Sequence, residues 1–350
     1  SIMALDLNAD VIEDFDTDIG FQRTQLPGFA AIYGLTAISG NRIACGGDQN
    51  LYKTAPVSAG LTILSETGDL DTAFNGYIGF PGAISRVYTI AEDTSTGILY
   101  VGGNFPYWDQ GPLGGTSDPY PNSKLIVALN GEDASTIAGF QSYFVDEAYS
   151  VSKIKIYNGK IYVAGSFGEY DGEIKRGIVR LNMDGSLDGS WNSAGVGIDS
   201  DLSGVADFAF YGSYIYITGR FTSYNGVARN RIARLNLTDG TLDTGWDPGA
   251  GLNDPSGGPA IYGAISVDAT GVYVGGNFTT YDGVTRGGIA KINHNATLNT
   301  TFAADIGFRT PPFTAPLFLG GVAQIFDIEL NGDASALYVT GIFGRYKGVG

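Results

Sequence analysis

The sequence is nearly free of the two side chains on which many active sites and most metal sites depend. Its 350 residues include one cysteine, Cys45, and one histidine, His294. A single cysteine cannot form an intrachain disulfide, and its position in an apolar, strand-like stretch indicates a buried, inert thiol. One histidine beside an asparagine in an expected turn offers neither a His-based triad nor a His-rich metal site. The G-x-S-x-G and P-loop patterns are absent as well.

Positive charge and long apolar runs are also scarce. Lysine and arginine together number 20 against 36 acidic residues, which gives a net charge of −16. Such a field repels phosphate backbones, so we expect no nucleic acid partner. No apolar run approaches the roughly 18 residues that a membrane-spanning helix needs, so we expect no membrane insertion.

Glycine, by contrast, is abundant and recurs at fixed places in a long repeat. Residues 272–293 read VYVGGNFTTYDGVTRGGIAKIN, and pieces of this stretch return along the whole chain. We mark each copy by the second of its two adjacent small residues, which is Gly276 in residues 272–293. In the most divergent copy the marker is Gly47. The other markers are Gly103, Gly165, Gly219 and Gly341. A spacing of roughly 60 residues means that one supersecondary unit is used repeatedly.

The clearest copy, residues 205–246, predicts four short strands joined by tight turns. The β-branched and aromatic segments that predict them are 206–210, 215–221, 231–236 and 241–246. Four antiparallel strands per unit describe one blade of a propeller, and no stretch has a helical period. We therefore predict an all-β fold in which residues 1–350 form a single domain, a six-bladed β-propeller of four-stranded antiparallel blades.

The two ends of the chain resemble complementary halves of one unit. Residues 3–16 match the second half of a repeat, and residues 337–350 match the first half. When the ends are joined, Tyr346 to Asn8 covers as many positions as Tyr281 to Asn293. This phase match predicts that the half-blade 1–16 completes the blade begun at 322–350, which closes the ring and leaves no open strand edge. The alternative is an excerpt of a longer tandem array.

The recurring pattern G-x-F-x-x-Y-x-G-x-x-R-x-x-I-x-R-L-N-x-D-G-x-L-D-x-x-F resembles the delta-sixty repeat family. That family has β-propeller-like repeats and occurs in bacterial surface and secreted proteins and in phage virion proteins. The best matches begin at Gly165, Gly219 and Gly276, whereas Gly47 is followed by DQNLYKTA, which lacks both the Phe and the Y-x-G. The resemblance implies a scaffold or binding role without a shared catalytic site, on a virion surface or outside the cell, with other structural proteins as partners.

Paired acidic residues recur in the N-x-D-G-x-x-D runs. One run contains Asn182, Asp184 and Asp188, and the other contains Asn236, Asp239 and Asp243. Asp and Asn cap turns by bonding their own backbone, which is the reading we prefer. Calcium at the Asp184 and Asp188 type of turn is the alternative, although the runs lack the ligand alternation and distal Glu of a full calcium loop. We expect no other cofactor.

Basic residues follow each Tyr-[Asp/Asn]-Gly turn. We predict that Arg176, Arg229 and Arg286 stack on a tyrosine or pair with an aspartate, and so pin the loop between strands. Their repetition favours a structural role, because a site usually appears once on a ring.

Two insertions occur once each and are the better candidates for binding. Residues 106–123 carry Tyr107, Trp108 and Tyr120, whose rings could stack on a sugar or anchor a protein; the alternative is a loop folded back on its own blade. Residues 309–321 form an apolar, Pro-broken run that suggests a partner interface or, alternatively, a channel plug or a blade-packing loop. Its candidate residues are Phe313, Leu317 and Phe318.

The sequence thus predicts a protein without catalytic residues. The preferred function is a structural or adhesion module of a virion, of the phage tail or fibre type, or of an extracellular surface assembly. Its insertions would bind a partner protein or a cell-surface glycan. The alternatives are a secreted carbohydrate-active enzyme with carboxylates at the propeller channel and a bare spacer within a longer surface protein.

Overall fold

A computed structural model places most of the repeats. It describes residues 21–22, 30–53, 55–81, 85–112, 119–120, 124–144, 150–199, 204–253, 263–302, 308–309, 324–342 and 345–346. In this part of the chain all regular elements are β-strands, so the expected all-β class is confirmed. The half-blade 1–16 lies outside the described residues, as does part of the region 322–350 that it would complete.

The chain divides into two compact units. Unit 1 comprises residues 1–163, 169–173 and 180–188, and unit 2 comprises residues 164–168, 174–179 and 189–350. The division passes through the third repeat, whose sheet has the order β13-β14-β17 (Ser150–Tyr157, Lys160–Ser166 and Ile178–Leu181).

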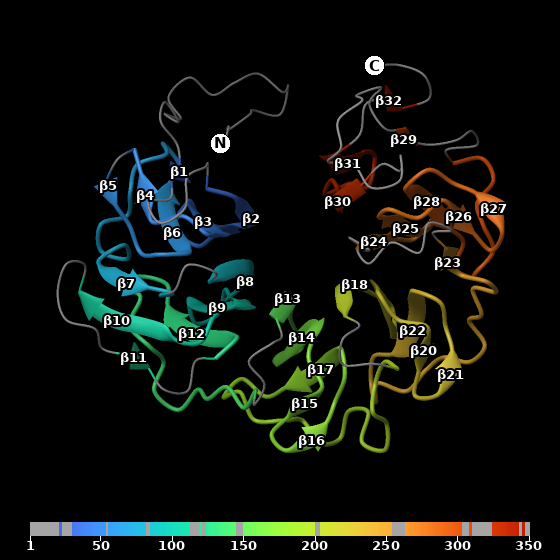
Figure 1. Ribbon diagram of the computed structural model, residues 1–350, viewed down its shortest axis with the longest axis horizontal. Coiled ribbons are helices and arrows are strands. Elements are labelled where there is room, and N and C mark those ends of the chain that lie inside the picture. Colours follow the sequence, from blue (N-terminus) through green and yellow to red (C-terminus); the bar gives the residue numbers. More distant parts are fainter. Residues whose placement is uncertain are drawn as a thin grey trace. The chain divides into compact units, whose positions relative to one another are not determined.

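Unit 1 contains two complete repeats, each with a three-stranded sheet (Figure 1). The first sheet has the order β2-β3-β6, formed by Ile32–Ile38, Arg42–Gly47 and Leu61–Ser65. The second has the order β8-β9-β12, formed by Arg86–Asp93, Ile98–Asn104 and Ile126–Asn130. All pairs are antiparallel. The strand β2 packs against β8, so neighbouring repeats meet through their first strands.

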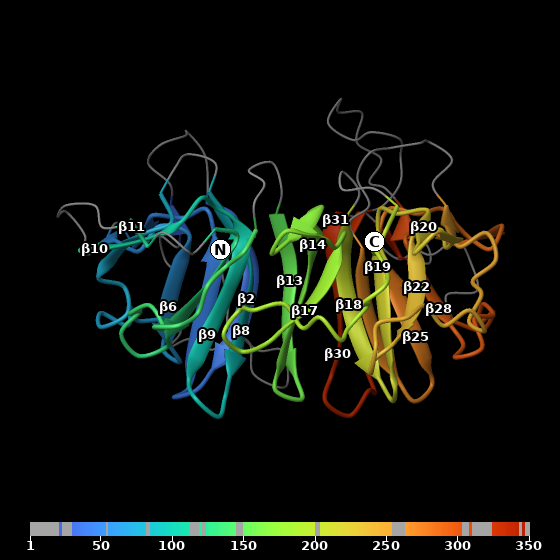
Figure 2. The same ribbon diagram turned by 90° about the horizontal axis from the view of Figure 1, so that it is seen from below.

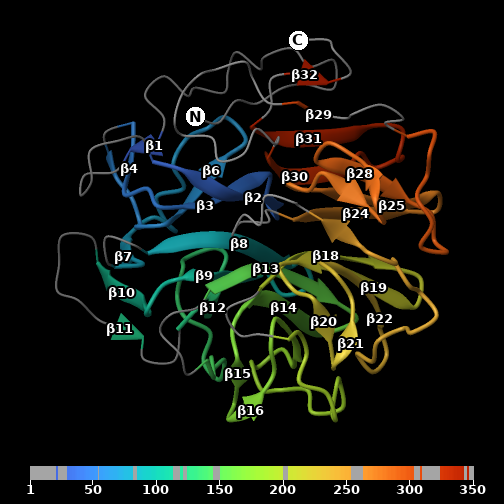
Figure 3. The ribbon, with the colours of Figure 1, turned by 45° about the vertical axis from the view of Figure 1, so that its right-hand side comes forward.

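Unit 2 repeats this arrangement, with the two complete sheets standing next to one another in Figure 2. One sheet is β18-β19-β22, formed by Val205–Tyr211, Tyr214–Gly219 and Ile232–Asn236. The next is β24-β25-β28, formed by Ala264–Asp268, Gly271–Gly275 and Ile289–Ile292. Among the described residues, the last sheet, shown in red in Figure 3, pairs only β30 with β31, formed by Gln324–Leu330 and Leu337–Ile342.

The fourth strand of each blade is shorter than the sequence suggests. In the repeat 205–246, the expected strand at 241–246 is a single bridge between Leu235 and Leu242. The reason is local: the Asp243 carboxylate accepts the Gly245 N–H at 3.0 Å, and the Trp246 N–H bonds the Asp243 carbonyl. The chain therefore turns after one ladder pair and carries Trp246 into the core, where it is fully buried.

Short strands outside the main sheets account for the remaining elements. Among the described residues, four repeats carry a hairpin of two strands with two residues each. These hairpins are β4/β5 (Leu51–Tyr52 and Ala55–Pro56), β15/β16 (Glu169–Tyr170 and Glu173–Ile174), β20/β21 (Ser223–Tyr224 and Val227–Ala228) and β26/β27 (Thr280–Tyr281 and Val284–Thr285). The others are β1 (Phe21–Gln22), β7 (Tyr77–Gly79), β10 (Trp108–Pro112), β11 (Pro119–Tyr120), β23 (Leu252–Asn253), β29 (Phe308–Arg309) and β32 (Arg345–Tyr346).

Four of the marker glycines, Gly47, Gly103, Gly219 and Gly341, sit opposite a β-bulge. The register of β18 and β19 shifts between Val205 and Asp207, and a Cβ at Gly219 would fall on the Gly204 carbonyl oxygen. Gly47, Gly103 and Gly341 meet the same obstacle in their own repeats, which explains why the position excludes larger residues. Five marker amides also donate to the carbonyl that precedes the third strand, at 2.9–3.1 Å. They belong to Gly47, Gly103, Gly165, Gly219 and Gly276.

Candidate functional site

A buried tyrosine in each small hairpin bonds the turn that ends the third strand, and we call this contact the tyrosine–turn bond. The Tyr224 hydroxyl donates to the Gly240 carbonyl at 2.9 Å, and Tyr281 donates to Ala296 at 2.6 Å. Tyr170 and Tyr52 make the equivalent bonds to Gly185 and Gly68. Burial raises the pKa of Tyr170, Tyr224 and Tyr281 well above the ordinary phenol value. These hydroxyls are therefore neutral structural donors.

Tyr52 corrects our view of the divergent first repeat. The sequence after Gly47 lacks a Tyr-x-Gly pattern, yet Tyr52 is buried and makes the tyrosine–turn bond. Lys53, the next residue, has φ of 45°, close to the 47° of Asn225 and the 45° of Asp282. A positive φ is needed at the first position of a two-residue turn of this hand, and Lys53 adopts it without the usual Asn or Asp.

The basic residues at the hairpins make a repeated backbone contact, and its alignment differs from the expected one. Arg229 and Arg286 donate their backbone N–H to Thr222 and Thr279, five positions after their tyrosines. In the third repeat this place belongs to Lys175, whose N–H bonds Gly168, and not to Arg176. Lys175 is 4% exposed, and its Nζ donates to the Asn192 carbonyl at 2.9 Å.

The arginines bind backbone rather than tyrosine rings. Arg229 donates to the carbonyls of Ala228 and Thr244, at 2.7 and 3.3 Å, and lies 3.7 Å from the Asp247 carboxylate. Arg286 donates to the Thr285 carbonyl at 2.7 Å. Because the same position bonds neighbouring carbonyls in successive repeats, its role is to hold loops.

The paired acidic residues are engaged in turns. Asp184 accepts the N–H and hydroxyl of Ser186, at 2.9 and 2.7 Å, and Asp239 does the same for Thr241. These bonds lower the pKa of Asp184, with the Ser186 hydroxyl as the main cause. Among the residues that the structure describes, no three His, Cys, Asp or Glu side chains gather as metal ligands. The turn reading accounts for these contacts.

The second aspartate of each run pairs with a basic residue on its own sheet. Asp188 accepts from Arg180 Nε at 2.9 Å and from Lys160 Nζ at 3.0 Å. Asp243 accepts from both Nε and Nη2 of Arg234, at 2.9 and 2.6 Å. In the second pair one carboxylate oxygen accepts two N–H donors, which fixes the orientation of the Arg234 guanidinium as well as neutralising it.

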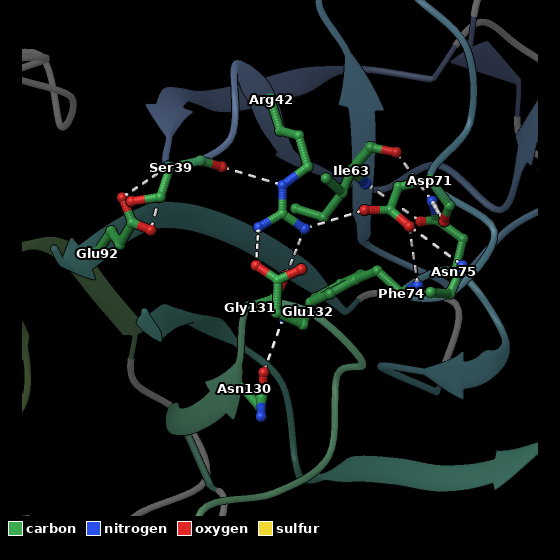
Figure 4. A network of polar contacts seen from close by, with 11 residues as sticks. Ser39, Arg42, Ile63, Asp71, Phe74, Asn75, Glu92, Asn130, Gly131 and Glu132 are labelled. Carbon is green, nitrogen blue, oxygen red and sulfur yellow. Dashed lines mark hydrogen bonds and ion pairs between the residues drawn. The ribbon is translucent and has the colours of Figure 1, made fainter. Parts of the chain in front are cut away.

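Arg42 joins the first and second repeats of unit 1 (Figure 4). Its guanidinium donates to the Asp71 carboxylate at 3.0 Å within its own repeat, and to the Gly131 carbonyl at 2.8 Å in the next. It also contacts Glu132 at 2.7 Å and the Ser39 carbonyl at 3.0 Å. Glu132 is 80% exposed, so its ion pair is weak, and Ser39 is exposed as well, whereas the bonds to Asp71 and Gly131 are partly buried. Four of five N–H groups are thus used inside the protein.

Arg234 makes the corresponding connection in unit 2, and it involves the only histidine. Its Nη1 donates to the His294 carbonyl at 2.9 Å. The His294 ring stacks on Tyr211 with centroids 4.6 Å apart and an interplanar angle of 14°. Nε2 lies 2.8 Å from the Asp268 carbonyl and must donate to it, which leaves Nδ1 to accept from the Tyr216 hydroxyl at 3.1 Å. Both ring nitrogens are therefore occupied by structural bonds.

The first insertion does not present its tryptophan to solvent. Trp108 is fully buried and packs edge-on against Phe80, with centroids 4.9 Å apart. We considered a ring that binds a sugar or a protein and, as the alternative, a loop folded back on its own blade; in the structure β10 pairs with both β7 and β11 and Trp108 faces the core. Tyr107 is half-buried, and Tyr120 pairs with Trp108 in the backbone register. Phe313, Leu317 and Phe318 lie outside the described residues.

An aromatic and cationic cluster in unit 1 was missed by the sequence analysis. Tyr33, 45% exposed, meets Tyr88 edge-on with centroids 5.3 Å apart, and the Arg86 guanidinium lies 5.9 Å from the Tyr33 ring centre. We call Tyr33, Tyr88 and Arg86 the bulge cluster, because the tyrosines sit at the register shifts of β2 and β8. A sequence signal existed: Arg86 occupies a repeat position that elsewhere holds uncharged residues. They are Ala31, Ser150, Gly204 and Gln324.

Comparisons with known proteins agree with a propeller. A family described as "Domain of unknown function (DUF5122) beta-propeller" matches residues 158–190, 215–245 and 271–302, which are three of the repeats. No curated protein is similar enough in sequence to match the chain. In the part of the chain that the structure describes, we find no helix long and apolar enough to span a membrane.

Solved structures resemble the chain at low identity. The extracellular domain of BT4673, assigned as a one component system of B. thetaiotaomicron, has 12% identity and a TM-score of 0.49 over 92% of this chain and 33% of its own. The extracellular domain of BT3049, assigned as a hybrid two component system of the same organism, has 13% identity and a TM-score of 0.46 over 89% and 32%. The chain thus spans about a third of the length of both. The WD40 β-propeller domain of Doa1 has 11% identity and a TM-score of 0.39 over 91% and 94%.

Proposed function

We propose that the protein is a non-catalytic structural or adhesion module of a virion, of the phage tail or fibre type, or of an extracellular surface assembly. The observation that carries this proposal is the repetition of its polar contacts. The hairpin tyrosines, the basic residues that follow them and the turn aspartates bond equivalent backbone groups in successive repeats. A catalytic constellation would occur once, and these side chains are already engaged in holding the fold.

The proposed scaffold is a closed, six-bladed propeller with repeats of the delta-sixty type. Support comes from Tyr338 on β31, which is 64% exposed, whereas its equivalents Tyr100, Tyr162, Tyr216 and Tyr273 are 1–7% exposed. Those tyrosines lie on strands flanked on both sides, but among the described residues β31 pairs with β30 alone. Residues 3–8, which match the third strand of a repeat, are the proposed occupant of this open edge.

Closure can be tested by a disulfide designed from the register of a complete sheet. Tyr273 lies opposite Lys291 in β25 and β28, and the aligned positions are Tyr338 and Asp6. In the double variant Asp6→Cys with Tyr338→Cys we expect an intrachain cross-link upon mild oxidation. The control pairs Leu5→Cys with Tyr338→Cys, one residue out of register and on the opposite face. Equal cross-linking of both pairs, or cross-links only between chains, would contradict closure.

Function is tested by location and by assay. We expect antibodies against the chain to label virions or cell surfaces of the source organism, and we expect no release of reducing sugar from a panel of polysaccharides. Labelling confined to the cell interior would contradict the surface role. Sustained release of reducing sugar, lost on substitution of a carboxylate pair, would instead support a secreted carbohydrate-active enzyme.

A further inference from the structure

The bulge cluster stands out because it is aromatic, solvent-accessible and built by two repeats. At each bulge one extra residue is accommodated in the first strand, and such residues redirect a side chain out of the regular alternation. Tyr33 and Tyr88 occupy this place in neighbouring repeats, and β2 and β8 lie side by side (Figure 3). The equivalent residue in the fourth repeat is Ala206, which has no ring, and in the last repeat it is Phe326, which is 42% exposed but has no hydroxyl.

The cluster continues along the exposed residues of β2. Leu35, two residues after Tyr33, is 55% exposed, so both side chains are at exposed positions of this strand. Among the tyrosines whose exposure the structure describes, only Tyr33, Tyr157 and Tyr338 are exposed, so an exposed tyrosine beside an exposed leucine is uncommon in this part of the chain. Tyr88 and Arg86 hold the ring of Tyr33 at its edge and over its face. A rigid ring that is already held loses little freedom when a ligand stacks on it.

From this geometry we propose that Tyr33, Tyr88 and Arg86 form a binding site for a neutral saccharide. The apolar C–H face of a pyranose would stack on the accessible part of Tyr33 and extend over Leu35. Arg86 hydrogen-bonds the Tyr88 side chain, and the N–H groups of its guanidinium that this bond leaves over would donate to sugar hydroxyls. This inference rests on the proposed binding role and specifies where, and to what, the module binds.

Charge decides between a neutral and an anionic sugar. The chain carries a net charge of −16, and the cluster supplies one guanidinium, whose surroundings include the Asp48 carboxylate. An anionic sugar would gain one contact with Arg86 while entering the negative field of the whole protein. A neutral sugar keeps the stacking and the hydrogen bonds without that repulsion.

The test uses the full chain, three neutral probes and one anionic probe. Saturation-transfer NMR and calorimetry would be run with maltotriose, cellotriose, N-acetylglucosamine trimer and digalacturonate. We expect at least one neutral trisaccharide to bind. Tyr33→Ala should weaken its affinity about tenfold, the size of a lost aromatic contact. Tyr33→Phe should bind as the wild type does, and Arg86→Lys, which keeps the charge but loses the fork, should bind several-fold more weakly.

Tyr157→Ala is the matched control, because Tyr157 is 36% exposed and lies on β13, away from both bulges. Circular dichroism would verify that each variant is folded. Tighter binding of digalacturonate would overturn the neutral assignment. No binding by the wild type, or equal binding by Tyr33→Ala and Tyr157→Ala, would overturn the site. The surface labelling described above is independent of these results, so the site and the proposed function can fail separately.

Discussion

Replacing Tyr224 with phenylalanine tests the tyrosine–turn bond, the contact that recurs in four repeats. The Tyr224 ring is fully buried, and its hydroxyl donates to the Gly240 carbonyl at 2.9 Å. Tyr224→Phe keeps the ring and its packing but leaves the carbonyl without this donor. A buried acceptor that loses its partner costs about 1–3 kcal/mol, and the ring itself loses nothing. We expect the free energy of unfolding to fall by about 1.5 kcal/mol.

Urea denaturation followed by tryptophan fluorescence is the appropriate assay, because Trp246 is buried in the same unit. Tyr157→Phe serves as the control, since Tyr157 is 36% exposed. The control should unfold within about 0.5 kcal/mol of the wild type. If Tyr224→Phe is as stable as the control, the hydroxyl does not hold the turn. A loss far above 3 kcal/mol would mean that the ring had moved and that the single-bond reasoning is wrong.

Three further predictions concern the repeats and their buried groups. Burial raises the pKa of Tyr170, Tyr224 and Tyr281, so above pH ~10 the unfolded chain ionises these phenols and the folded chain does not. Below pH ~10 these tyrosines should not affect the free energy of unfolding. Above it, each should lower that free energy by about 1.4 kcal/mol per pH unit, so the urea midpoint should be lower at pH 11 than at pH 9. Equal midpoints would refute this prediction. Gly219→Ala should lower the stability of the protein in a thermal melt by about 2–3 kcal/mol, because the new Cβ would meet the Gly204 carbonyl. Gly189→Ala should change the stability little, because a Cβ at Gly189 would have no atom within 4 Å. Burial raises the pKa of Cys45 to about 12, so the thiol should react with a disulfide reagent at pH 8 only after denaturation, and rapid reaction of the native protein would contradict its burial.

The order of strands within a repeat was readable from the sequence because it depends on local patterns. The expected strands 206–210, 215–221 and 231–236 correspond to β18, β19 and β22, and their ends differ by no more than two residues. Alternating apolar side chains and tight-turn residues act over a few positions, so they need no knowledge of the distant chain. The fourth segment departs from this rule because Asp243 bonds Gly245 and ends the ladder early.

Aligning the repeats by residue type gave the wrong register where two kinds of side chain can make the same contact. Arg176 looks like the partner of Arg229, yet the backbone places Lys175 at that position. Both lysine and arginine can donate to loop carbonyls, so the identity of the residue did not reveal the register. In the same way, the missing Tyr-x-Gly pattern after Gly47 concealed Tyr52, because Lys53 adopts a positive φ that is normally left to Asn, Asp or Gly.

The sequence by itself determined the repeat, the β-strand content and the positions of the marker glycines, since each follows from neighbouring residues within one repeat. Only the tertiary structure decided which aromatic side chains face solvent. Trp108 lies in a Gly- and Pro-rich insertion that suggests exposure, but strand pairing folds it onto Phe80. Tyr33 and Arg86 are far apart in the sequence and meet because β2 and β8 are neighbours. Exposure depends on which surfaces pack together, and that is a property of several repeats at once.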